Sequence, residues 1–258
     1  MRVFLLLLIL LLVLDATIFA TPIYMAIWQG ILVPGHLLSD FYYSMLLSLY
    51  TSTTSSILIL LITIPIGYYI SRRITRRNLL LPVIMLPSSI SPAAVGLLLL
   101  LFFTKTPLGL IIDNTLKIVN DPKGIIAAQL FLGIPVGVSY FTALFSSIPR
   151  SYEDAALTMG FTNIEYLYTI LLPMSTRQVF TGFILVFTRV LGDFGASYII
   201  GGGIWGKTVT LPIYLYLVSQ LGGIGVLVIT LSIYIVSILV LIAVVYQLES
   251  MEGHPQNA

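Results

Sequence analysis

The chain has 258 residues, of which 58% are hydrophobic and 9% are charged, and its mean hydropathy is +1.06. These values are typical of a protein dissolved in lipid and exclude a soluble domain of ordinary composition. The net charge of +2 gives no reason to expect nucleic acid, and zero cysteines exclude disulfides and thiolate metal sites.

The apolar segments predict an all-α integral membrane protein, a single transmembrane domain over residues 1–258. Six transmembrane helices are expected, over residues 3–23, 45–70, 79–103, 125–145, 176–200 and 224–246. The first begins like a secretory signal. Its apolar character continues past Asp15 without a small-residue cleavage site, so we interpret it as a retained helix. Interior prolines such as Pro65 and Pro135 remove backbone hydrogen bonds, which neighbouring helices or a wet cavity must replace.

The basic residues predict how the chain crosses the membrane. Seven of them share one side: Arg2, Arg72, Arg73, Arg76, Arg77, Arg150 and Arg177. The other side holds four: Lys105, Lys117, Lys123 and Lys207. The positive-inside rule therefore places both termini, and the "SRRITRR" run, on the cytoplasmic side of the cell membrane. We interpret that run as an orientation anchor rather than a site of lipid recognition.

A polar loop over residues 149–173 separates the fourth and fifth predicted spans. Ser151 is expected to cap a first helix, with Asp154 at the third position of a capping box. Gly160 suits the left-handed position that ends this helix. Thr162 then caps a second helix in the same way, and Pro173 closes the unit or opens the next span. The sequence thus predicts a cytoplasmic helix–glycine–helix loop.

This loop is better suited to a protein partner than to lipid. A connection between two spans needs only a few residues. An interfacial helix is expected to carry basic residues on its polar face, yet between Ser151 and Pro173 there are three acids and no base. Ala155 and Ala156 leave a face with little side-chain bulk, so another surface can approach closely. We therefore expect a cytoplasmic protein to dock here.

The loop resembles the signature loop of ABC-transporter permease subunits, in which fixed gaps separate seven positions. In this sequence they are Asp154, Ala155, Ala156, Gly160, Ile170, Leu172 and Pro173. The family usually has glutamate where Asp154 stands, and the preceding Glu153 adds to the acidic character. The resemblance implies that these residues, with Glu153, dock onto a separate ATP-hydrolysing subunit in the cytoplasm.

Other segments extend the resemblance to a type I importer fold. "LITIPIGYYISRR" and "LPVIMLPSSISPAAVGLLLL" resemble the family's second and third spans. "FTRVLGDFGASYIIGGG" with "KTVTLPIYLY" is most similar to permeases for molybdate, tungstate and sulfate. The resemblance implies an extracytoplasmic substrate-binding protein and a second permease subunit as partners. A homodimer is the default, although sulfate-type members pair two different permeases. No cofactor is expected in this chain, because the partner ATPase binds the ATP.

Three other functions were weighed. Related permeases import ferric iron, thiamine or polyamines. A stand-alone channel or secondary transporter needs its own intramembrane charges, for which Asp15, Arg189 and Asp193 are the candidates. A membrane enzyme is disfavoured because the two histidines, His36 and His254, lie outside the spans and no catalytic motif is present. No catalytic or metal-binding residue is therefore predicted.

The fifth predicted span carries an Arg–Asp pair. Arg189 lies near its middle and Asp193 four residues later, so a continuous helix places both on one face. Glycines flank the aspartate, and Gly195 allows another helix to pack closely. We expect Arg189, Asp193 and Gly195 either to form part of the translocation pathway or gate, or to hold the bundle together through an ion pair.

Overall fold

The computed structural model describes residues 35–74 and 77–220, together with Thr17, Ala20, Thr21, Tyr24 and Leu231. The predicted first and sixth spans therefore lie almost wholly outside the described residues. The chain divides into two compact units, one of Tyr43–Ile213 and one of Met1–Tyr42 with Tyr214–Ala258. In the second unit, the rings of Phe41 and Tyr214 meet edge to face at 6.0 Å.

Every regular element within the described ranges is a helix, in agreement with the predicted all-α class. In chain order these are α2 (Gly35–Arg73), α3 (Arg77–Ile84), α4 (Leu86–Ser89), α5 (Pro92–Lys105), α6 (Pro107–Leu116), α7 (Pro122–Ser147), α8 (Ser151–Thr158), α9 (Asn163–Glu165), the π-helix η1 (Tyr166–Leu171), α10 (Leu172–Met174), α11 (Thr176–Leu191), α12 (Gly195–Gly201) and α13 (Leu211–Gln220).

Two helices in the described part are long and apolar enough to cross a membrane, over Ser39–Arg73 and Pro122–Ser147. Two bent pairs would raise the number to four if each is one span. They are α5 with α6, at 89°, and Asn163–Met174 with α11, at 86°. The predicted third span, over residues 79–103, is not one continuous helix, because the chain forms α3, α4 and most of α5 there. The number of six spans thus remains a prediction.

Prolines explain several of these breaks. Pro87, Pro92 and Pro107 each lie in the first turn of a helix, where a missing N–H costs little. Ser91 and Thr106 accept hydrogen bonds from Ala94 and Gly109 and so cap α5 and α6.

Helix α2 has the inside-out character of a membrane helix. Most of its serine and threonine side chains are buried, and Ser52 and Ser55 have no exposed surface. Many of its leucines and isoleucines face outward, and Leu61 is 66% exposed. In water this arrangement would be unfavourable, because burial of apolar surface drives folding. In lipid it is expected, because small polar residues join helices there.

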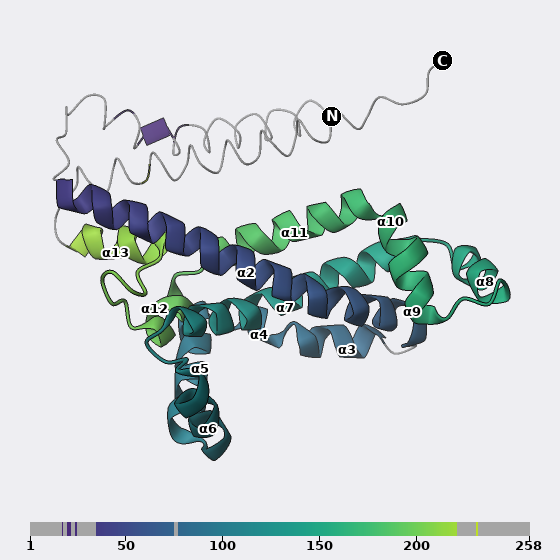
Figure 1. Cartoon of the computed structure of the whole chain (residues 1–258), viewed down its shortest axis with the longest axis horizontal. Coiled ribbons are helices and arrows are strands. Elements are labelled where there is room, and N and C mark those ends of the chain that lie inside the picture. Colours follow the sequence, from purple (N-terminus) through teal and green to yellow (C-terminus); the bar gives the residue numbers. More distant parts are fainter. Residues whose placement is uncertain are drawn as a thin grey trace, which may run out of the picture. The chain divides into compact units, whose positions relative to one another are not determined.

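Helix α7 is the centre of the larger unit, with contacts to α3, α4, α5, α11 and α12 (Figure 1). It also packs closely on α2, since a Cβ at Gly67 would lie 2.7 Å from the Cβ of Phe141. Phe141 and Phe145 belong to a buried cluster that includes Tyr166 and Leu171 from η1. The loop after α7 is therefore packed onto the bundle rather than hanging from it.

Candidate functional site

The first helix of the loop ends as its sequence predicts. Gly160 has a φ of +93°, a conformation that L side chains rarely adopt. The N–H of Gly160 donates to the carbonyl of Leu157, and that of Phe161 donates to the carbonyl of Ala156. These two bonds form a Schellman motif, which satisfies carbonyls that the helix end leaves open. The left-handed glycine is confirmed.

The expected cap at Ser151 is wrong, whereas the cap at Thr162 is confirmed. Ser151 is the first residue of α8, and Arg150 at the cap position makes no side-chain capping bond. Thr162 forms a full capping box, in which its N–H donates to Glu165 Oε2 at 2.7 Å and its Oγ1 accepts from the N–H of Glu165 at 3.3 Å. The backbone bond from Thr162 lowers the pKa of the Glu165 carboxyl.

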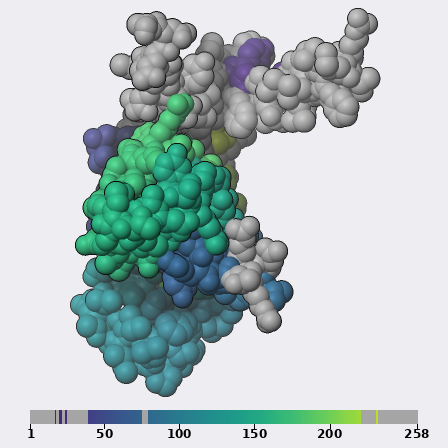
Figure 2. All heavy atoms as spheres, turned by 90° about the vertical axis from the view of Figure 1, so that its right-hand side faces the viewer, coloured from purple at the N-terminus to yellow at the C-terminus, as the bar shows by residue number. Residues whose placement is uncertain are grey.

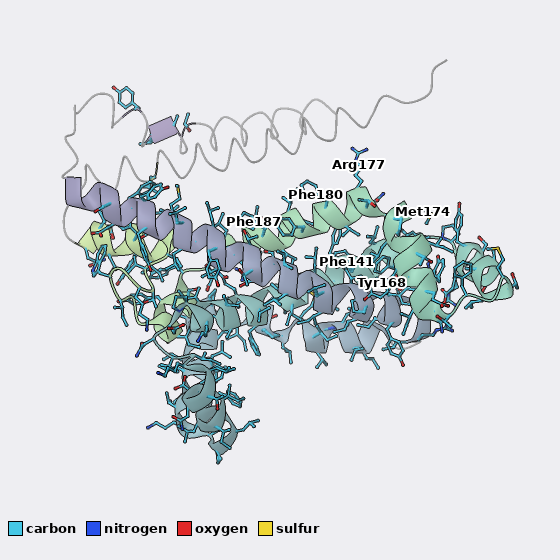
Figure 3. The ribbon with its side chains drawn as sticks, in the orientation of Figure 1. Phe141, Tyr168, Met174, Arg177, Phe180 and Phe187 are labelled. Atoms are coloured by element: carbon cyan, nitrogen blue, oxygen red, sulfur yellow. The ribbon has the colours of Figure 1, made fainter. Side chains whose placement is uncertain are left out.

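The second helix of the loop begins as a short α-helix and continues beyond it. α9 continues as the π-helix η1 and then as α10, and π-turns are frequent at functional sites. Pro173 lies in α10 and is exposed. The chain then turns by 86° into α11. In Figure 3, Met174 marks this corner, and Arg177 at the start of α11 points away from α7. Pro173 therefore lies in the last turn before this corner.

Glu153 is turned inward and ties the loop to the end of α2. Its Oε2 lies 3.3 Å from Arg72 Nε, and its Oε1 lies 3.1 Å from both Arg73 Nη2 and the Tyr68 hydroxyl. Arg73 also donates to Asn163 Oδ1 at 2.6 Å. We call these five residues the Glu153 cluster. The Arg72 and Glu153 side chains are only 3% and 7% exposed, so this is a buried ion pair.

The sequence did not reveal these partners. The sequence pattern indicates an orientation anchor for the arginine run and points to neither Tyr68 nor Asn163. Two adjacent acids in the loop and an arginine pair at a span end were the available signals. Only the fold brings them together, since about 80 residues separate Arg72 from Glu153 along the chain.

The remaining docking candidates divide by exposure. Ala156 is buried against the bundle, and Ile170 and Leu172 are partly buried. The exposed ones are Asp154, Ala155, Gly160 and Pro173. The exposed surface also includes apolar side chains that were not predicted: Tyr152, Leu157, Met159, Phe161 and Ile164. The view onto this end of the molecule in Figure 2 shows α8 to α10 in green facing the viewer.

The fifth predicted span is broken, which corrects the expected Arg–Asp pair. α11 ends at Leu191 and α12 begins at Gly195. Asp193 is 3% exposed, and its Oδ2 accepts from the N–H and hydroxyl of Ser197 at 3.0 and 2.6 Å. It therefore holds the first turn of α12 from one residue before the cap position, which is Phe194. Arg189 is half-buried on α11, and it makes no ion pair with any carboxylate in the described part of the chain.

Contacts with α5 and α7 stabilise the break between α11 and α12. Gly195 packs against α5, since a Cβ there would lie 2.8 Å from the N atom of Ala93. This is the close approach that the sequence predicted, made within the same chain. Gln129 of α7 is 2% exposed, and its Nε2 donates to the carbonyl of Val190 at 3.2 Å. The hydroxyl of Ser55 donates to Gln129 Oε1 at 2.7 Å. Polar groups freed at a helix end inside a membrane need such partners.

The aromatic side chains of α11 form a ladder along the helix. Phe180, Phe183 and Phe187 stack successively, with ring centroids 6.4 and 5.8 Å apart. Phe180 is exposed and Phe187 is buried (Figure 3). Within the described residues no group of three or more histidine, aspartate or glutamate side chains is placed to hold a metal.

Comparison with known proteins gives both a family and a fold. The family model described as binding-protein-dependent transport system inner membrane component matches residues 60–251. A solved structure of a bacterial ABC transporter involved in the import of the acidic polysaccharide alginate matches 95% of this chain and 96% of its own, with a TM-score of 0.61 and 17% identity. At that identity the likeness shows the fold alone.

Curated relatives point to oxyanion permeases. The sulfate transport system permease protein CysW of Synechococcus elongatus is 34% identical over 140 residues, which cover 54% of this chain and 49% of the relative. The molybdenum transport system permease protein ModB of Mycobacterium bovis is 30% identical over 179 residues, 67% of each chain. The molybdate/tungstate permease protein WtpB of Pyrococcus abyssi is 29% identical over 154 residues, 59% of this chain and 58% of the relative. The chain thus spans about half to two thirds of these relatives.

Proposed function

Because the chain belongs to the family of binding-protein-dependent transport system inner membrane components, we propose that it is the permease subunit of an ATP-driven importer. Its solute is a small tetrahedral oxyanion: molybdate, tungstate or sulfate. The observation that carries the proposal is the loop over residues 149–173. One side of this loop is packed onto the helix bundle, and the other side exposes apolar and acidic side chains. The names of the curated relatives support the choice of oxyanions.

The loop is the site at which the ATPase subunit binds the permease and transmits the effect of ATP hydrolysis. Asp154, Ala155 and Gly160 are exposed on α8 and its end, beside Met159 and Phe161. A cytoplasmic ATPase subunit binds this surface, with apolar contact at its centre and the carboxylate at its rim, as in other protein interfaces. The sequence has no G-x-x-x-x-G-K-[ST] motif, so the ATP is bound by the partner subunit.

Glu153 has a different role from the one implied by the family resemblance. It is bound to Tyr68, Arg72 and Arg73 and does not reach the exposed surface. It anchors the docking loop to α2, so a displacement of α8 by the ATPase is passed to a membrane-spanning helix. Asp154 is then the acidic residue that meets the partner.

The break between α11 and α12 is the proposed gate region. Discontinuous helices form substrate sites in several transporters, because their ends carry open backbone groups. Asp193 holds α12 in place, and the half-buried Arg189 attracts an anionic solute. A second permease subunit, a homodimer partner by default, completes the pathway, and an extracytoplasmic binding protein delivers the solute.

Uptake measurements in cells test this function. Cells that lack the chain should lose high-affinity uptake of radiolabelled tungstate, molybdate or sulfate and regain it when the gene is restored. As a control, the restored chain should fail when the partner ATPase cannot hydrolyse ATP. Unchanged uptake of all three anions, with loss of iron, thiamine or polyamine uptake, would move the proposal to those solutes. Transport by the purified chain alone, without ATP, would contradict it altogether.

A further inference from the structure

A groove of about 520 Å³ lies between the last turns of α2 and the second helix of the loop. Its wall is mainly apolar and aromatic, with Tyr69 from α2 and Ile164 and Tyr168 from the loop. Tyr168 is labelled in Figure 3. These three side chains are 60%, 70% and 54% exposed. Arg73 and Asn163 add polar groups to the same wall. The docking role of α8 does not use this groove.

The length of α2 places the groove at the membrane surface. The apolar stretch Ser39–Arg73 has 35 residues, which is about 52 Å at 1.5 Å per residue. The hydrocarbon core of a bilayer is only about 30 Å thick. The last turns of α2 therefore extend into the headgroup layer, on the side that the arginine run marks. Tyrosines such as Tyr69 and Tyr168 are enriched at this depth.

The groove carries unbalanced positive charge. Arg72 and Arg73 share the single carboxylate of Glu153, so this group of three has one excess positive charge. Arg72 is buried, whereas the side chain of Arg73 is 44% exposed. The bonds of Arg73 to Glu153 and Asn163 both use Nη2. A guanidinium has five N–H donors. Those on Nε and Nη1 donate to no acceptor in the described part of the chain, so they can face an anion.

We propose that this groove binds one anionic phospholipid. Its phosphate lies on the Arg73 guanidinium, so this arginine of the run recognises lipid in addition to orienting the chain. An acyl chain follows the wall formed by Tyr69, Ile164 and Tyr168. A cation next to an apolar surface at headgroup depth suits an anionic lipid, whose phosphate and acyl chain are complementary to the two. The lipid bridges α2 and the docking loop, so the composition of the membrane affects how firmly the loop is held. The proposal requires a membrane-spanning chain and is independent of the transported solute.

Native mass spectrometry of the purified full chain tests the proposal. The protein in detergent is titrated with phosphatidylglycerol and, separately, with phosphatidylcholine. We expect one phosphatidylglycerol per chain to bind at least about tenfold more tightly than phosphatidylcholine. Ile164→Asp places a carboxylate in the groove and should remove most of this preference. Met159→Asp is the matched control, because Met159 is 68% exposed on the same loop but does not line the groove.

Three outcomes would overturn the proposal. Equal binding of the two lipids would show that the groove does not recognise the headgroup charge. Displacement of phosphatidylglycerol by millimolar inorganic phosphate would show a site for a free anion rather than for lipid. If Ile164→Asp keeps the lipid preference but loses the ATPase subunit, the groove is part of the protein interface instead.

Discussion

Glu153→Ala should release the docking loop from α2 while leaving the membrane helices in place. The substitution removes the carboxylate from between Arg72 and Arg73. Of the described residues, only Ile148 then remains as a hydrogen-bond partner of the buried Arg72 cation, through its carbonyl at 3.0 Å. Breaking a buried ion pair by removing one partner costs about 3–5 kcal/mol. The contribution of Arg73 is discounted, because its side chain is 44% exposed and solvent screens it.

Amide hydrogen exchange measures this loosening directly. The amides of Met159 and Phe161 donate within the end of α8, and they exchange when the loop opens locally. A loss of about 3–5 kcal/mol corresponds to exchange that is faster by roughly 10²–10³-fold or more, since about 1.4 kcal/mol is a factor of ten. Affinity for the ATPase subunit should fall as well, because the loop must then be ordered during binding.

Asp154→Ala is the matched control, since the neighbouring acid is exposed. This variant should leave exchange of the loop amides almost unchanged and should weaken only binding of the ATPase subunit. Equal acceleration of exchange in both variants, or none in Glu153→Ala, would refute the assignment of Glu153 as the anchor and Asp154 as the docking acid.

Three further changes test the loop end and the broken span. Gly160→Val should strain the backbone by about 1–3 kcal/mol, because φ is +93°. The strain is conformational and not steric, since an added Cβ would meet no atom within 4 Å. Binding of the ATPase subunit should weaken, and it should weaken less in Gly160→Asn, because asparagine tolerates this φ better. Gln129→Leu leaves the Ser55 hydroxyl without its acceptor and should lower the free energy of unfolding by about 1–3 kcal/mol. The loss is measured as a lower thermal midpoint in detergent, and Gln178→Leu, at an exposed position, should leave that midpoint unchanged. Arg189→Gln should leave the complex assembled but cut transport at least about tenfold, roughly 1.4 kcal/mol; loss of the protein from the membrane would instead make Arg189 structural.

The sequence by itself determined the structural class of the chain and where the helices of its loop begin and end. Composition indicated a helical membrane protein. The left-handed Gly160 and the capping box of Thr162 and Glu165 were predictable because their hydrogen bonds join residues at most five apart. Such features depend on backbone geometry and side-chain chemistry within one turn, and a short stretch of sequence contains both. The spacing of the seven signature positions in the loop indicated the family.

Only the tertiary structure decided which loop residues face inward and where the spans break. Glu153 and Asp154 are adjacent acids, yet one is buried among residues some 80 positions away and the other meets solvent. Arg189 and Asp193 have the spacing of a helical pair, yet the helix ends at Leu191, where Gln129 of α7 donates to the carbonyl of Val190. In lipid no water is available to satisfy a polar group, so its partner must come from another helix. That partner is distant in sequence, and for this reason local patterns could not show it.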